Sequence, residues 1–152
     1  SCPACLSDHR NGAFDPLLDW RLGRSMVRFL LDPSCDFGAT DPQGTEFSDW
    51  RKIALPIRDQ LLHVLHKTDQ FDQVTVSDDV STQLPMIKLS AWGAEFVVAM
   101  VHPFWRPEDS GTTVVFDSVA DDAKVIFVDT FNGLRRPSWC VEKIVKEMRA
   151  LA

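Results

Sequence analysis

The feature that most constrains the fold is a run of six residues without a polar side chain, Phe96-Val97-Val98-Ala99-Met100-Val101. Because successive side chains of a strand point to opposite faces, a continuous apolar run is typical of a central strand that is covered on both sides. The segment Lys124–Asp129 (KVIFVD) indicates a second buried strand. We therefore expect an α/β fold in which helices flank a sheet.

Two more strands and three helices complete the predicted architecture. Phe71–Ser77 alternates, and Leu84–Ala91 leads through the turn Trp92-Gly93-Ala94 into Glu95–His102 as a hairpin. Helices are predicted from Pro16, after the N-cap Asp15, to about residue 31, from Ser48 to about His66, and from Pro137 onward. The expected fold is a four-stranded mixed sheet flanked by helices, with an N-terminal helix after a Cys-x-x-Cys knuckle. Residues 112–122 fit a strand or a short helix, and Asn132-Gly133 indicates a turn.

Helical periodicity predicts which helix faces point inward. In the second helix, Pro56 either kinks the helix or marks its first turn. The apolar stripe of that helix comprises Trp50, Ile53, Ile57, Leu61, Val64 and Leu65. In the last helix, the inward positions are Val141, Ile144, Val145 and Met148.

The chain is predicted to contain three regions. Residues 1–32 hold the knuckle and the first helix, residues 33–47 are a linker without periodicity, and residues 48–152 are an α/β domain. From residue 48 the elements run helix, three strands, a helix, strand, helix. This order matches the core of the PD-(D/E)xK nuclease-like fold, of which the domain would be a degenerate relative.

Charge and composition limit the classes of function. With 22 acidic and 16 basic residues the formal net charge is −6, whereas a protein that binds nucleic acid on its own is usually basic. Five Trp and ten Phe indicate a folded globule. The sequence has neither a signal peptide nor an apolar run long enough for a membrane span, so we expect a cytoplasmic protein without membrane contact.

The thiols at the start of the chain indicate a metal site. Cys2 and Cys5 form a Cys-x-x-Cys knuckle, which is half of a tetrahedral zinc site. Since the chain begins here, we expect it to be a piece whose remaining ligands lie upstream. The alternatives are that His9 supplies a third ligand, or that the two thiols are exposed in a frayed terminus. Cys35 and Cys140 stand alone and are expected to be apolar residues in a reducing compartment.

Three blocks of the sequence are similar to a known family. They are CPACL with Asn11 and LLDWRLG at the start, HPFW (102–105) and VDTFNGLRRP (128–137). These blocks resemble the C-terminal region of DEAD/DEAH-box superfamily 2 DNA helicases that carry a four-cysteine zinc module. The resemblance implies an accessory domain of a helicase in DNA repair or phage defence. It also implies a structural zinc ion shared by Cys2 and Cys5 with upstream cysteines, and contact with the motor domains.

The chain itself lacks the motifs of an ATP-driven enzyme. It contains neither a G-x-x-x-x-G-K-[ST] loop nor a DEAD/DEAH tetrad. It also lacks the G-x-S-x-G elbow of hydrolases and the G-x-G-x-x-G fingerprint. We therefore expect no catalysis by this chain, and any helicase activity would belong to the parent protein.

Four residues near strand ends are candidates for DNA or interdomain contact. His102 and Asp129 each end a predicted strand, so they would share one edge of the sheet if those strands are neighbours. Arg135 and Arg136 follow, and adjacent arginines can clamp a phosphate. The alternative is structural: Asp129 pairs with one of the arginines, and His102 caps a turn.

A second set of basic residues lies on the first predicted helix. Arg21, Arg24 and Arg28 recur on one face, where they could follow a phosphate backbone. Asp19 and Asp32 are close in sequence, so an ordinary solvated helix face explains the stripe equally well. The pattern alone does not choose between the two.

Two other functions compete with the accessory-domain interpretation. A PD-(D/E)xK nuclease needs an Asp and a Glu-x-Lys to hold Mg²⁺, but Glu95 is followed by Val97, and Lys88 lies on the preceding strand. Asp78 and Asp79 could supply an acid, so the constellation is incomplete. A protein-interaction module is the other alternative, with Trp105 and Trp139 as exposed anchors.

Overall fold

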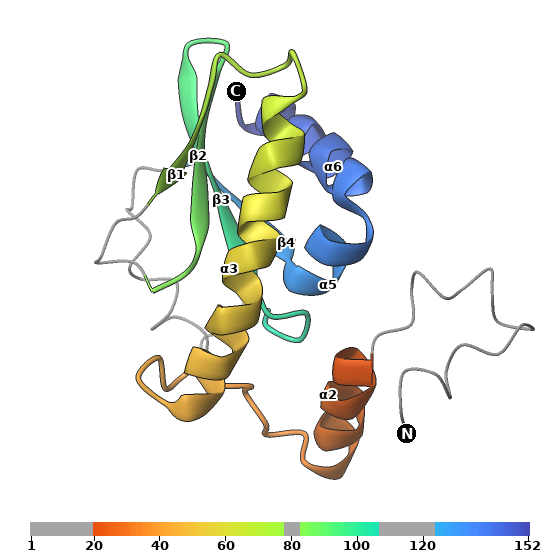
Figure 1. Cartoon of the computed structure of the whole chain (residues 1–152). Helices are drawn as coiled ribbons and strands as arrows, with labels where there is room; N and C mark the ends of the chain where they lie inside the picture. Colours follow the sequence, from red (N-terminus) through yellow and green to blue (C-terminus); the bar gives the residue numbers. More distant parts are fainter. Residues whose placement is uncertain (1–19, 78–82, 107–123) are drawn as a thin grey trace, which may run out of the picture. The chain divides into compact units, whose positions relative to one another are not determined.

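The computed structural model describes residues 20–77, 83–106 and 124–152 (Figure 1). The chain divides into two compact units, Ser1–Cys35 and Asp36–Ala152. The first unit contains helix α2 (Trp20–Leu31), and the second contains all the other described elements. The boundary falls within the predicted linker. Phe37 and Ala39, also from that segment, are buried in the second unit, so this part of it contributes to a core.

The second unit is built on a four-stranded mixed sheet, which confirms the predicted α/β fold. Its strands are β1 (Gln73–Ser77), β2 (Met86–Ala91), β3 (Ala94–Val101) and β4 (Lys124–Asp129), in the spatial order β1-β2-β3-β4. β1 and β2 pair antiparallel, as do β2 and β3, whereas β3 and β4 are parallel. The apolar run therefore lies in an interior strand of this sheet, as its sequence predicts.

The β2–β3 hairpin turns where the sequence predicts. Trp92 and Gly93 both have left-handed backbone angles, with φ of 54° and 74°. Two such residues in succession give a turn whose twist matches that of the flanking strands. Glycine takes this conformation without steric cost, but the Cβ of a tryptophan disfavours it.

Three helices pack with this sheet: α3 (Thr45–His66), α5 (Thr130–Arg135) and α6 (Pro137–Leu151) (Figure 1). α3 contacts β1, β2 and β3, while α5 and α6 contact β4. A Cβ added to Gly133 of α5 would lie 2.8 Å from Ile57 of α3 and 3.1 Å from Met100 of β3. α5 is therefore packed tightly against both α3 and the sheet.

Helix α3 begins earlier than the sequence predicts. It starts at Thr45, its N-cap is Gly44 without a side-chain hydrogen bond, and Ser48 lies inside it. Pro56 also lies inside the helix, so it does not mark the first turn. The reason is tertiary packing: the buried face is Phe47, Trp50, Ala54, Ile57, Leu61 and Leu65, which starts before Ser48 and leaves out Ile53.

The C-terminal helices confirm one prediction and correct another. α6 begins at Pro137 and buries the four predicted residues together with Cys140. Asn132-Gly133 is not a turn, because both residues belong to α5. The predicted segment 112–122 lies outside the described residues, as does the start of the first predicted helix.

Candidate functional site

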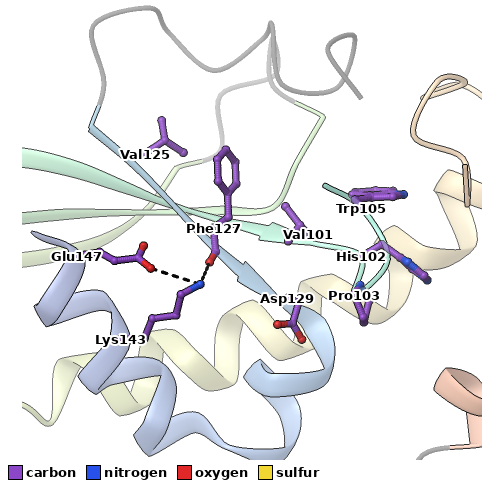
Figure 2. A pocket seen from close by; sticks show the side chains of 9 residues that line it. All are labelled: Val101, His102, Pro103, Trp105, Val125, Phe127, Asp129, Lys143 and Glu147. Carbon is purple, nitrogen blue, oxygen red and sulfur yellow. Dashed lines mark hydrogen bonds and ion pairs between the residues drawn. The ribbon is translucent and has the colours of Figure 1, made fainter. Parts of the chain in front are cut away.

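The C-terminal ends of β3 and β4 lie side by side and form the candidate site. The parallel register pairs Val101 with Asp129, so His102 and Asp129 share one edge of the sheet. A pocket of about 360 Å³ opens here (Figure 2). Its apolar lining comprises Val101, Pro103, Trp105, Val125 and Phe127, and its polar lining comprises His102, Asp129, Lys143 and Glu147.

Asp129 is the N-cap of helix α5. One carboxylate oxygen accepts a hydrogen bond from the Asn132 backbone N–H at 2.8 Å, and the other accepts one from the Asn132 side-chain amide at 2.7 Å. Such a cap satisfies a helix N–H that would otherwise have no partner. Asn132 was missed as a site residue, although the Asp-x-x-Asn spacing is a capping signal.

His102 caps a turn, as the structural alternative states. Its Nδ1 accepts a hydrogen bond from the Phe104 N–H at 3.2 Å, and its carbonyl oxygen accepts one from the Trp105 N–H at 3.0 Å. The imidazole ring stacks on Phe37, with ring centroids 4.7 Å apart. Because Nδ1 acts as an acceptor, the neutral ring carries its proton on Nε2.

Trp105 is not an exposed anchor, contrary to the prediction. Only 5% of its surface is accessible, and its indole N–H donates to the Asp36 carbonyl oxygen at 2.9 Å. Its ring centroid lies 4.3 Å from that of Trp50 and 5.9 Å from that of Phe47. The HPFW block therefore anchors the first residues of the second unit. Trp139, by contrast, is 44% exposed.

The anchored segment is a tight turn around Phe37 and Gly38. Both residues have positive φ, 53° and 81°, and a Cβ on Gly38 would lie 2.7 Å from the Phe47 backbone nitrogen. Partial burial opposes the ionisation of Asp36. Hydrogen bonds from the Thr40 hydroxyl and from the Gly38 and Thr40 backbone N–H groups outweigh it, so the pKa of Asp36 lies below its ordinary value.

Lys143 and Glu147 bring charge from α6 to the pocket. The Lys143 ammonium donates to the Phe127 carbonyl oxygen on β4 at 2.6 Å and lies 3.6 Å from the Glu147 carboxylate. Sequence reasoning missed both residues. The i, i+4 spacing indicates a helix-surface pair but does not show which strand the pair faces.

The two arginines do not join this pocket. Arg135 is half-buried in the last turn of α5, Arg136 is exposed between α5 and α6, and neither lines the pocket. The structure thus brings together His102 and Asp129 but not the complete predicted group of four.

The basic stripe of α2 belongs to the first unit. Arg21 and Arg24 are exposed, and Arg28 donates to the Cys35 thiol sulfur at 3.2 Å. Met26 and Leu30, predicted to face inward, are 51% and 77% exposed. The zinc-ligand candidates Cys2 and Cys5, with His9, lie outside the described residues. The other lone thiol, Cys140, is fully buried as predicted, and burial raises its pKa to about 11.

The nuclease constellation is only partly within the described residues. Lys88 pairs with Val97 and Ser90 with Glu95, so Lys88 and Glu95 lie on the same face of the sheet as diagonal neighbours. Val97 is buried, while Asp78 and Asp79 lie outside the described ranges. Within residues 20–77, 83–106 and 124–152, no three His, Cys, Asp or Glu side chains are placed to hold a metal ion.

Comparisons with known proteins give no family assignment. No family model, no curated protein and no solved structure matches the chain. Of the helices in the described part of the chain, none is both long enough and apolar enough to cross a membrane.

Proposed function

We propose that the chain is a non-catalytic C-terminal accessory domain of a cytoplasmic, superfamily 2 DNA helicase-like protein in DNA repair or phage defence. Its N-terminal knuckle would complete a structural zinc site with upstream cysteines. Its α/β body would contact the motor domains or DNA. The proposal rests on the resemblance of three sequence blocks, and one geometric observation supports it.

That observation is the structural use of the polar residues in two of these blocks. HPFW and VDTFNGLRRP meet at the ends of β3 and β4, where Val101 pairs with Asp129. The Asp129 carboxylate caps α5, and the His102 imidazole caps a turn. Side chains engaged in this way stabilise a domain, which supports an accessory role rather than hydrolytic chemistry.

The zinc component can be tested directly. Thiolates are soft ligands that suit zinc, and a closed four-ligand site would tie the knuckle to the preceding chain. We expect a version of the chain extended upstream to hold one zinc ion, and to lose it when Cys2 and Cys5 are both replaced by Ser. Replacing Cys35 and Cys140 by Ala is the matched control. Unchanged zinc content in the Cys2→Ser, Cys5→Ser protein would refute the ligand assignment.

The DNA component depends on the arginine pair. Replacing Arg135 and Arg136 by Ala should weaken DNA binding by the parent protein and reduce the slope of affinity against salt concentration by about two charges. Replacing Lys146 and Arg149, two exposed cations on α6, is the control for overall charge. An equal slope in both double variants would favour interdomain contact over DNA contact.

A metal-dependent nuclease is the second candidate function. The observation that favours it is the placement of Lys88 and Glu95 on one sheet face. If it is correct, the chain with Mg²⁺ or Mn²⁺ should cut plasmid or single-stranded DNA, and Glu95→Gln should abolish cutting while Glu142→Gln should not. Intact DNA after hours of incubation would count against this candidate, and specific cutting would overturn the non-catalytic proposal.

A further inference from the structure

The pocket at the ends of β3 and β4 has the size and the two-sided lining of a small-molecule site. Its volume of about 360 Å³ lies in the range typical of sites for small organic ligands. Phe127 and Val101 form part of an apolar wall, and Asp129, Lys143 and Glu147 stand on the other side (Figure 2). A ligand there would meet one flat apolar surface and several polar groups at its edge.

The charges in the pocket restrict what the ligand can be. Each oxygen of Asp129 accepts one bond from Asn132 and keeps a further lone pair, so this carboxylate still accepts. The Lys143 ammonium uses one N–H on the Phe127 carbonyl and retains donors. A bare anion would meet two carboxylates, and a bare cation would meet the ammonium. The lining therefore favours a neutral ligand that carries both donors and acceptors.

We propose that this pocket binds an unpaired nucleobase. A base is planar, presents N–H donors beside carbonyl or ring-nitrogen acceptors on its edge, and stacks its face on aromatic side chains. The Phe127 ring offers such a face, Asp129 accepts from the base, and Lys143 donates to it. The phosphates stay outside, because the carboxylates of Asp129 and Glu147 repel them.

This inference rests on the proposed function only in naming nucleic acid as the source of the base. The complementarity between the pocket and a base edge follows from the lining alone. Its test therefore uses the 152-residue chain by itself, without helicase motor or added zinc. A negative result would leave the zinc and domain experiments unaffected, and their failure would leave this binding result standing.

The experiment is a titration of the ¹⁵N-labelled chain with the four 2′-deoxynucleosides, followed by amide chemical shifts. We expect at least one nucleoside to shift the amides of Val101, Phe127 and Asp129, with a dissociation constant on the order of 1 mM for so small a ligand. Inorganic phosphate and arginine amide, which carry the two excluded charges, should leave these amides in place at the same concentrations.

Paired variants connect the shifts to the pocket. Lys143→Gln and Asp129→Asn each remove a charged hydrogen-bonding partner and should weaken nucleoside binding about tenfold. Asn also caps helices well, so the second change keeps the cap of α5. Lys146→Gln and Glu142→Gln alter exposed neighbours on α6 and should leave the affinity unchanged. The amide spectrum of each variant reports whether the fold is retained.

Several outcomes would overturn the proposal. Shifts produced by arginine amide but by no nucleoside would make this a site for a basic side chain. Shifts produced by phosphate would make it an anion site. Absence of shifts with every probe, or equal weakening in the Lys143→Gln and Lys146→Gln proteins, would show that the pocket does not bind a base.

Discussion

Replacing Asp129 by Ala should destabilise the second unit by about 2 kcal/mol. The change removes an N-cap, which typically contributes about 1 kcal/mol. It also removes the bond to the Asn132 side-chain amide at 2.7 Å, a partly buried contact that adds about 1 kcal/mol. α5 has only six residues, so it depends on this cap and on its packing rather than on its own helix propensity.

Equilibrium unfolding in urea measures this loss. With a denaturant dependence of about 2 kcal/mol per molar, the Asp129→Ala midpoint should fall by about 1 M at an unchanged slope. Asp129→Asn keeps the acceptor for the Asn132 backbone N–H and should lose about half as much. Glu147→Gln, a pocket residue without a cap role, should change stability by at most about 0.5 kcal/mol.

The order of these three midpoints decides whether the reasoning holds. If Asp129→Ala unfolds at the same urea concentration as the original chain, the carboxylate does not stabilise α5 and its structural role is refuted. Equal losses for Asp129→Ala and Glu147→Gln would assign the effect to charge rather than to capping. Either result would return Asp129 to the list of residues available for a contact function.

Three further predictions concern packing and titration. Gly133→Ala should destabilise by about 1–3 kcal/mol because its Cβ would lie 2.8 Å from Ile57, whereas Gly23→Ala, with open space around it, should stabilise α2 by up to about 1 kcal/mol; urea midpoints and helical circular dichroism measure the two changes. Stability should fall as the pH rises from about 9 to about 11, because the Cys140 thiol ionises more readily unfolded; Cys140→Ala should flatten that limb, and an unchanged limb would contradict the assignment. The lowered pKa of Asp36 contributes stability above its ordinary value of 3.8 that is lost as the pH falls through the folded pKa, so Asp36→Asn should weaken acid unfolding, and an identical acid limb would contradict this.

Local signals predicted the elements that bury a simple periodic pattern. The apolar run of β3, the strand KVIFVD and the four inward residues of α6 are all located as predicted. The Trp92-Gly93 turn also follows from local chemistry, because glycine at positive φ permits the tight connection. In these segments, a side chain's position along the chain determines whether it faces the core.

Tertiary packing decided the rest. Asn132-Gly133 is a turn signal in isolation, yet Gly133 lies in a helix because its missing side chain lets α5 approach Ile57 and Met100. Trp105 is buried through contacts with Phe47, Trp50 and the Asp36 carbonyl, which are distant in sequence. The pocket likewise needs β3, β4 and α6 together. Such pairings depend on which segments meet in space, and a periodicity over ten or twenty residues carries no information about them.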